Sequence, residues 1–186
     1  MTMSRSDRGL EAAREQWRWR GRDRPPFAVE PGPGQVSVWD FPRPPRLQSD
    51  PREVVIRCGE VEVARSLSAI TVLETAHPPS FYLPWTDVAR QWLIPAPGAS
   101  LCEWKGAARY WTLVAGGRRL ERVAWSYPEP LPGAEALRDR VAFYPAALDC
   151  RVGGAPVRPQ PGGFYGGWIT PELVGPFKGD PGSQGW

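Results

Sequence analysis

The sequence has little sulfur and little histidine, and it has no long apolar run. Its 186 residues include three cysteines, two methionines and one histidine. Cys58, Cys102 and Cys150 are far apart and form no paired C-x-x-C motif, which excludes a zinc framework and a disulfide scaffold. No apolar run is long enough to cross a bilayer, and the charged N-terminus is unlike a signal peptide. We therefore expect a soluble, cytoplasmic protein without membrane partner, metal or other cofactor.

An excess of one charge is also missing. The formal net charge is only +3, which is a weak argument for nucleic-acid binding. Arginine is concentrated in "REQWRWRGRDR", where Trp17 and Trp19 lie between basic residues. Such a segment could contact phosphates and stack on bases, but a solvated, poorly ordered arm is the favoured interpretation. Nucleic acid is therefore not an expected partner.

Glycine and proline are abundant, with 20 and 23 residues, and they disfavour long regular elements. Hydrophobic residues make up 41% of the chain and include 10 tryptophans, whose burial can hold a compact core together. The length suits one core domain with appendages. We expect an N-terminal extension over residues 1–50, a core domain over 51–153 and a tail over 154–186.

Both extensions carry aromatic residues. Residues 6–19 have apolar side chains at helical spacing and predict a short helix. The proline-rich stretch after it suits neither a helix nor a central strand, so we expect it to run extended, with Trp39 and Phe41 as anchors. The tail alternates glycine pairs with more aromatic residues than a linker carries. We expect the tail to dock on the core or on a partner chain.

The core segment contains short strand-like runs separated by turn residues. Hairpins are predicted around Cys58-Gly59 and around Gly116-Gly117, with a further strand over 70–73. The stretch "DRVAFYPAALDCRV" predicts a third strand pair, separated by Pro145. These elements favour a mainly β, antiparallel, barrel-like domain over a parallel α/β sheet.

One helix is predicted within the core, over residues 86–93. Thr86 and Asp87 suit its first turn, Val88 and Trp92 lie one turn apart, and Pro95 ends it.

The order of motifs from Glu53 to about Gly153 resembles one bacterial family. The quoted matches are "RCGEVEVARS", "VLETAHPPSFYLPWTDV", "SLCEWKGAARYW" and "VAWSYPEPLPGA". They closely resemble the domain of unknown function 427, which some collections label a nucleotidyltransferase-type domain. The terminal "GGFYGGWITPELVGPFKGDPG" looks like actinobacterial members. The resemblance implies a small β-tent similar to methionine sulfoxide reductase B and to the thalidomide-binding domain of cereblon, which cages a flat ligand with aromatic side chains. The paired cysteines of a zinc clamp are missing here.

The sequence lacks the motifs that nucleotidyl transfer requires. That reaction needs paired carboxylates to hold Mg²⁺ against a triphosphate, and no D-x-D or D-x-E occurs. Lys105-Gly106 reverses the order of a P-loop and has no glycine-rich approach.

Four polar residues are candidates for chemistry: Lys105, Glu74, His77 and Cys102. Cys102 and Trp104 are expected on one face of a strand, with Glu103 and Lys105 on the other. Lys105 could anchor an anion or act as an amine nucleophile if burial lowers its pKa, and Cys102 could act as a thiolate or be a small buried hydrophobe. His77, the only histidine, could act as a base with Glu74 and Tyr82 or sit in solvent.

Aromatic residues near Lys105 and the second hairpin are candidates for a ligand pocket. Aromatics on facing strands are more often core than cage, but this many indoles exceed what a small interior requires. Trp111 and Trp125 are expected at neighbouring positions, and Glu129 could close the site with a carboxylate. The candidate ligand-binding residues are Trp104, Trp111, Trp125, Tyr127, Tyr82 and Glu129.

The leading hypothesis is a domain that binds a small heterocycle or anionic metabolite in an aromatic-walled pocket, with Glu74 and Lys105 as polar contacts. A metal-independent enzyme in the same pocket is the first alternative. The second is an assembly module whose tail docks on a neighbouring subunit of a homo-oligomer.

Overall fold

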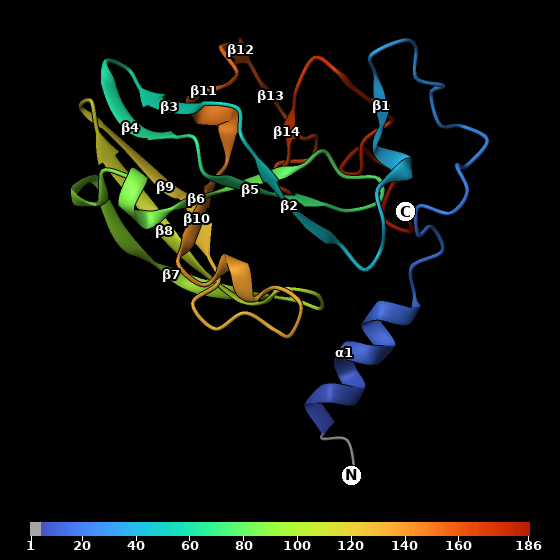
Figure 1. Cartoon of the computed structure of the whole chain (residues 1–186). Helices are drawn as coiled ribbons and strands as arrows, with labels where there is room; N and C mark the ends of the chain where they lie inside the picture. Colours follow the sequence, from blue (N-terminus) through green and yellow to red (C-terminus); the bar gives the residue numbers. More distant parts are fainter. Residues whose placement is uncertain (1–4) are drawn as a thin grey trace.

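The computed structural model describes residues 5–186, with side chains from residue 8 onward. One α-helix, α1 (Arg5–Glu15), lies within this range and projects away from a β-rich body (Figure 1). The predicted helix over 6–19 is confirmed but ends earlier. No helix in the described part of the chain is long and apolar enough to cross a membrane.

Two antiparallel sheets form the body. The larger is a seven-stranded, curled half-barrel with the order β2-β5-β6-β10-β9-β8-β7, and the smaller has the order β12-β11-β3-β4. The larger contains β2 (Arg46–Asp50), β5 (Ala69–Leu73), β6 (Ser80–Pro84), β7 (Leu93–Cys102), β8 (Gly106–Ala115), β9 (Arg118–Ser126) and β10 (Arg140–Phe143). The smaller contains β3 (Val54–Cys58), β4 (Val61–Ser66), β11 (Asp149–Val152) and β12 (Ala155–Pro156). The prediction of a mainly β, antiparallel, barrel-like domain is confirmed.

Two short strand pairs lie in the terminal segments, and the first of them joins the N-terminal segment to the C-terminal one. Strand β1 (Val36–Ser37) pairs in parallel with β15 (Leu173–Val174), and β13 (Arg158–Pro159) pairs with β14 (Trp168–Ile169). The N-terminal and C-terminal segments therefore lie side by side on the body (Figure 1).

Both predicted hairpins are present. The turn between β8 and β9 consists of Gly116 and Gly117, with φ of 58° and 69°. Two consecutive positive φ values suit the twist of a two-residue hairpin, and glycine adopts them without strain. A Cβ at Gly116 would lie 2.6 Å from the carbonyl oxygen of Cys58, so the turn also packs closely on the β3–β4 hairpin.

Two predictions of secondary structure in the core are wrong. Residues 86–93 form 3-10 turns at Trp85–Asp87 and Arg90–Trp92 instead of an α-helix, because Val88 between them is extended and bridges to Ala64. So short a segment cannot stabilise a helix against that pairing. The strands on either side of Pro145 do not pair with each other: β10 pairs with β6 and β9, whereas β11 pairs with β3.

The two faces of the large sheet carry different clusters of buried apolar residues. One face meets the four-stranded sheet through apolar residues such as Phe81, Leu113 and Phe143. The opposite face carries a second cluster that includes Tyr82, Trp125 and Tyr127. A third cluster, centred on the anchors Trp39 and Phe41, holds the terminal segments; it also contains Trp19 and Trp186.

The C-terminal segment belongs to the core. Trp168 is completely buried, packs against Phe81 with ring centroids 5.1 Å apart, and donates its indole N–H to the carbonyl oxygen of Phe143 at 2.8 Å. Replacing Trp168 by alanine should lower the free energy of unfolding by about 3–5 kcal/mol, because a large cavity and an unpaired carbonyl remain. Chemical denaturation measures this change. The matched control is Phe164→Ala in the same segment, which is 68% exposed and should change stability little; equal effects of the two variants would contradict the packing described.

Candidate functional site

A cavity of about 210 Å³ opens on the aromatic face of the large sheet. Its walls come from β5, β6, β8 and β9, from the turn between β7 and β8, and from both terminal segments. Most of the candidate residues border it: Glu74, His77, Tyr82, Cys102, Lys105, Trp125 and Tyr127. The cavity therefore brings together residues from distant parts of the sequence.

Three candidate residues lie elsewhere. Trp111 is on the opposite face of the sheet. The register of β8 and β9 shifts between Trp111 and Leu113, and beyond the shift Trp125 faces Tyr110 while Trp111 faces Ala124. Glu129 is exposed and does not border the cavity. Trp104 lies under the guanidinium of Arg14, 5.1 Å from the ring centroid, and its buried Nε1 has no hydrogen-bond partner among residues 5–186.

The prediction that residues 102–105 point alternately to the two faces of a strand is wrong. Residues 103–105 form a turn, so they do not alternate between two faces as strand residues do. Cys102, Glu103 and Lys105 all border the cavity, whereas Trp104 does not.

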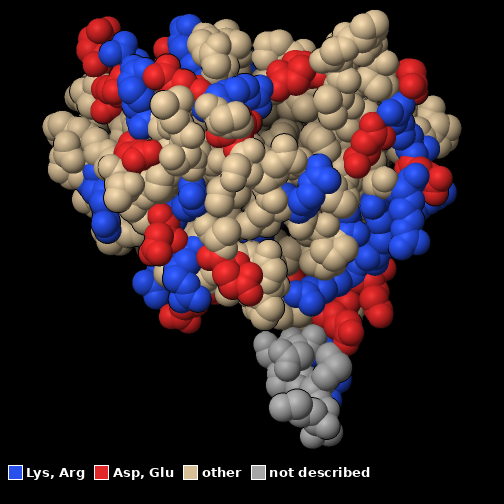
Figure 2. Space-filling model, viewed as in Figure 1, with Lys and Arg blue, Asp and Glu red and all other residues tan. Residues whose placement is uncertain are grey.

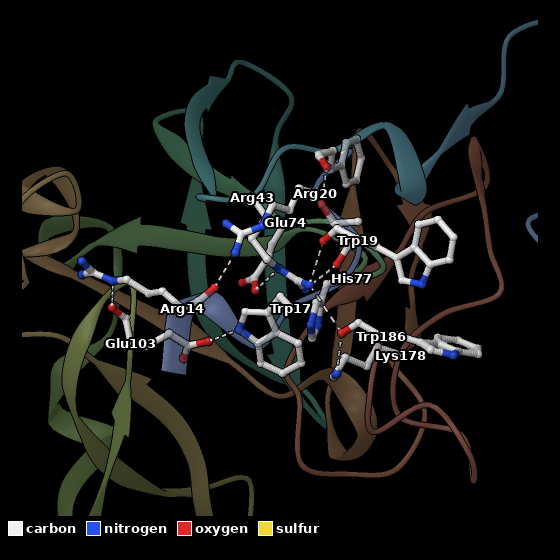
Figure 3. A network of polar contacts seen from close by, with 12 residues as sticks. Arg14, Trp17, Trp19, Arg20, Arg43, Glu74, His77, Glu103, Lys178 and Trp186 are labelled. Carbon is white, nitrogen blue, oxygen red and sulfur yellow. Dashed lines mark hydrogen bonds and ion pairs between the residues drawn. The ribbon is translucent and has the colours of Figure 1, made fainter. Parts of the chain in front are cut away.

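Glu74, at the end of β5, is an anion between two buried cations. Its Oε1 lies 3.3 Å from Nε of Arg43, and its Oε2 lies 3.4 Å from Nζ of Lys105. The side chain of Arg43 is fully buried, and its terminal nitrogens donate to the carbonyl oxygens of Trp19 and Thr75 (Figure 3). The carboxylate thus joins the proline-rich segment, the sheet and the β7–β8 turn.

This arrangement fixes the charges in the cavity. Burial alone would raise the pKa of Glu74, but Lys105, His77 and Arg43 hold it at about 2. Burial opposes the charge of Lys105, yet attraction to Cys102 and Glu74 raises the pKa of the ammonium well above its ordinary value. Lys105 is therefore charged at neutral pH, and the lowered pKa that an amine nucleophile requires is not found.

His77 is neutral and held by Gln160. The amide of Gln160 accepts a hydrogen bond from N–H of Gly167 at 3.1 Å, so its Nε2 donates to Nδ1 of His77 at 2.9 Å and to the carbonyl oxygen of Lys178. With Nδ1 accepting, the ring proton lies on Nε2. Burial, followed by the nearby cations, lowers the pKa of His77 to about 4 although Glu74 opposes this shift. Its imidazole can donate a hydrogen bond to a guest at neutral pH.

The aromatic residues that border the cavity differ in their hydrogen bonding: Trp125 is fixed by one, whereas the hydroxyl of Tyr127 has none. The indole N–H of Trp125 donates to the hydroxyl of Tyr82 at 3.0 Å, with the two rings at 86°. Gly166 touches the far edge of this indole, since a Cβ there would lie 2.1 Å from the ring. The hydroxyl of Tyr127 makes no hydrogen bond with residues 5–186 and borders the cavity.

The N-terminal segment supplies a wall that the sequence did not reveal. Trp17 borders the cavity and donates its indole N–H to Oε1 of Glu103 at 2.6 Å. The guanidinium of Arg43 and the ammonium of Lys178 lie 4.6 Å and 4.2 Å from the Trp17 ring centroid. Figure 3 shows this indole between Glu103 and Lys178. The expected solvated arm is therefore wrong for Trp17.

Basic side chains collect where this segment meets the body. Figure 2 shows Lys and Arg forming a band along that flank, while both signs are interspersed elsewhere in the view. Lys178 is almost fully buried there, and burial together with Arg43 lowers its pKa to about 8. Its ammonium donates to the main-chain oxygens of Gln184 and Trp186, which fixes the C-terminal segment beside Trp17.

Other cavity residues were also missed, among them Gln160, Tyr144 and Tyr165. The many aromatic residues of the tail were the one sequence signal that pointed to Tyr165. Nothing in the sequence distinguishes Gln160 from other polar residues. Among residues 5–186, no three His, Cys, Asp or Glu side chains are grouped so that they could hold a metal ion.

Residues 46–154 match the family model NTP_transf_9, described as a domain of unknown function (DUF427). The chain belongs to the DUF427 family. The match begins with β2 and ends just after β11, so Glu74, Lys105 and Trp125 lie inside the DUF427 domain. Trp17 and Gln160 lie outside it and complete the cavity from the two flanks. A comparison with curated proteins finds no match.

The state of His77 makes stability depend on pH. Above pH 6.5 the imidazole is neutral in the folded and unfolded chains; between pH 6.5 and 4 the unfolded chain takes up a proton that the folded chain does not. Stability should therefore fall across this window as the pH is lowered, by roughly 3 kcal/mol at most, with no further loss from His77 at lower pH. Denaturant unfolding at a series of pH values measures the slope. His77→Gln should flatten it, and identical slopes for both proteins would show that His77 is not buried in its neutral form.

Proposed function

We propose that the DUF427 domain of this protein binds a small, flat organic anion in the aromatic-walled cavity. The observation that carries the proposal is the state of Lys105. An ammonium has three N–H donors, and the only hydrogen-bond partner of Nζ of Lys105 among residues 5–186 is Oε2 of Glu74, at 3.4 Å. A positive charge bordering a cavity, with donors to spare, favours a guest with a carboxylate or another strong acceptor.

The remaining lining fits the same kind of guest. Nε2–H of His77 and the free hydroxyl of Tyr127 are further donors, and Glu74 is already shared by two cations. The rings of Trp125 and Tyr127 offer apolar faces. A cavity of about 150 Å³ can hold benzene, so 210 Å³ suits a guest of roughly eight to ten non-hydrogen atoms. A ring carboxylate meets these requirements.

The alternatives have less support. Covalent catalysis through Lys105 is disfavoured by its raised pKa, and His77 has its lone pair on Nδ1 engaged by Gln160. Cys102 borders the cavity as a free thiol, so a role in chemistry there stays a prediction. The C-terminal segment packs on its own body through Trp168, which gives an assembly role no support beyond the sequence. The free thiols suit the reducing, cytoplasmic location that we propose.

Calorimetric titration with benzoate and nicotinate tests the proposal, with benzyl alcohol as the uncharged comparison. The carboxylates should bind more tightly than the alcohol. Trp125→Ala should abolish binding, because the guest loses its wall. Lys105→Met should weaken carboxylate binding about tenfold to a hundredfold and leave alcohol binding unchanged, since one charge-assisted hydrogen bond is lost.

The matched control is Trp92→Ala. Trp92 is 37% exposed and does not border the cavity, so the variant should bind the carboxylates as the unaltered protein does. Thermal unfolding of each variant establishes that it is folded. Carboxylate binding that survives both Trp125→Ala and Lys105→Met, or no binding by any ring carboxylate, would contradict the proposal.

A further inference from the structure

A second concavity, of about 620 Å³, lies on the other face of the large sheet. We call it the arginine groove; it is lined by Trp85, Arg90, Arg109, Trp111, Ser126, Arg138, Asp139 and neighbouring residues. Trp125 faces the cavity and the adjacent Ser126 faces the groove, because successive strand residues point to opposite faces. The two sites are therefore separated by the sheet and share no residue.

No carboxylate of residues 5–186 forms a hydrogen bond or short ion pair with the guanidiniums of the groove, although the charge of Arg138 acts on nearby Glu135. Within residues 5–186, the side chains of Arg90, Arg109 and Arg138 make no hydrogen bond or ion pair. Arginines elsewhere on the surface differ: Arg65 and Arg119, for example, contact carboxylates at 2.6–2.7 Å. Three guanidiniums around one concavity, with a single carboxylate among its lining residues, create a positive potential that attracts an anion.

The floor of the groove is aromatic and fixed. The rings of Trp85 and Trp111 lie 5.1 Å apart at 73°, and both are only partly buried. Trp111 donates its indole N–H to the hydroxyl of Ser126 at 3.0 Å. The main-chain N–H of Trp85 donates to the carbonyl oxygen of Asp139 at 3.1 Å, and Arg90 stacks 4.9 Å from the Trp85 ring centroid. An L-shaped pair of indoles held in this way offers a preformed surface to a flat ring.

We propose that the arginine groove binds a phosphate monoester that carries a flat ring. Arg109 and Arg138 contact the phosphate, because a guanidinium matches two phosphate oxygens at once. The ring packs on Trp85 and Trp111. Asp139, the one carboxylate of the lining, accepts a hydrogen bond from a donor on the ring or sugar. The groove binds its ligand without transferring the phosphoryl group.

Calorimetric titration of the full chain with AMP tests the inference, with adenosine and inorganic phosphate as half-ligands. AMP should bind at low salt and weaken as salt is added, and each half-ligand should bind at least about tenfold more weakly than AMP. Arg109→Gln and Arg138→Gln should each weaken AMP about tenfold. Both residues are exposed, so neither variant should disturb folding. In an NMR spectrum, AMP should shift the indole N–H signals of Trp85 and Trp111 but not that of Trp125.

Arg158→Gln is the matched control, since Arg158 is an exposed arginine outside the groove. Lys105→Met is a second control, and AMP affinity should be unchanged in both.

Three results would overturn the inference: no AMP binding at low salt, equal affinity for AMP and adenosine, or an effect of Arg158→Gln as large as that of the groove variants. Binding of a single-stranded oligonucleotide without binding of AMP would also overturn it and identify a nucleic-acid surface instead. Because Lys105 and Trp125 take no part, failure here leaves the proposed function of the cavity untouched.

Discussion

The structure depends on one carboxylate that is shared by two buried cations. Glu74 compensates the charges of Arg43 and Lys105, neither of which could be taken out of water alone without a cost of several kcal/mol. Arg43 in turn holds the carbonyl oxygens of Trp19 and Thr75, and Lys105 stands at the turn between the two longest strands. The ion cluster is therefore the point where the flanking segment, the end of β5 and the rim of the half-barrel are joined.

The same cluster determines the chemical character of the cavity. Since Glu74 is engaged by cations and Lys105 keeps its proton, the cavity has donors and a positive charge available, but no free base among Glu74, Lys105 and His77. Tyr82, Trp125 and Tyr127 of its aromatic wall belong to the DUF427 domain, whereas Trp17, Gln160 and Tyr165 come from outside that domain. The two faces of one sheet then serve different purposes: one encloses the cavity, and the other packs on the small sheet and presents the arginine groove.

Sequence patterns predicted the elements that depend on neighbouring residues, namely turns and strands. Gly116-Gly117 placed a hairpin, β-branched runs placed β3 and β5, and Trp39 and Phe41 were recognised as anchors. Tertiary pairing overrode the helix expected over 86–93, because Val88 bridges to Ala64 of β4 and the N–H of Ala89 donates to the carbonyl oxygen of Val63. The position of Trp111 could not be read from the turn alone, because the register of β8 and β9 shifts between Trp111 and Leu113 and leaves Trp111 opposite Ala124 and Trp125 opposite Tyr110. Arg43, Trp17 and Gln160 could not be found in this way, since their partners are distant in sequence and follow no spacing.

The charge of Lys105 can be tested directly. NMR titration of the lysine Nζ signals, with Lys105 assigned by comparison with Lys105→Met, measures its pKa in the folded protein. We expect Lys105 to lose its proton well above the ordinary value of 10.5: burial opposes its charge, but attraction to Cys102 and Glu74 outweighs burial and raises the pKa. A pKa at or below 10.5 would contradict the shared carboxylate and, with it, the anion-binding character of the cavity.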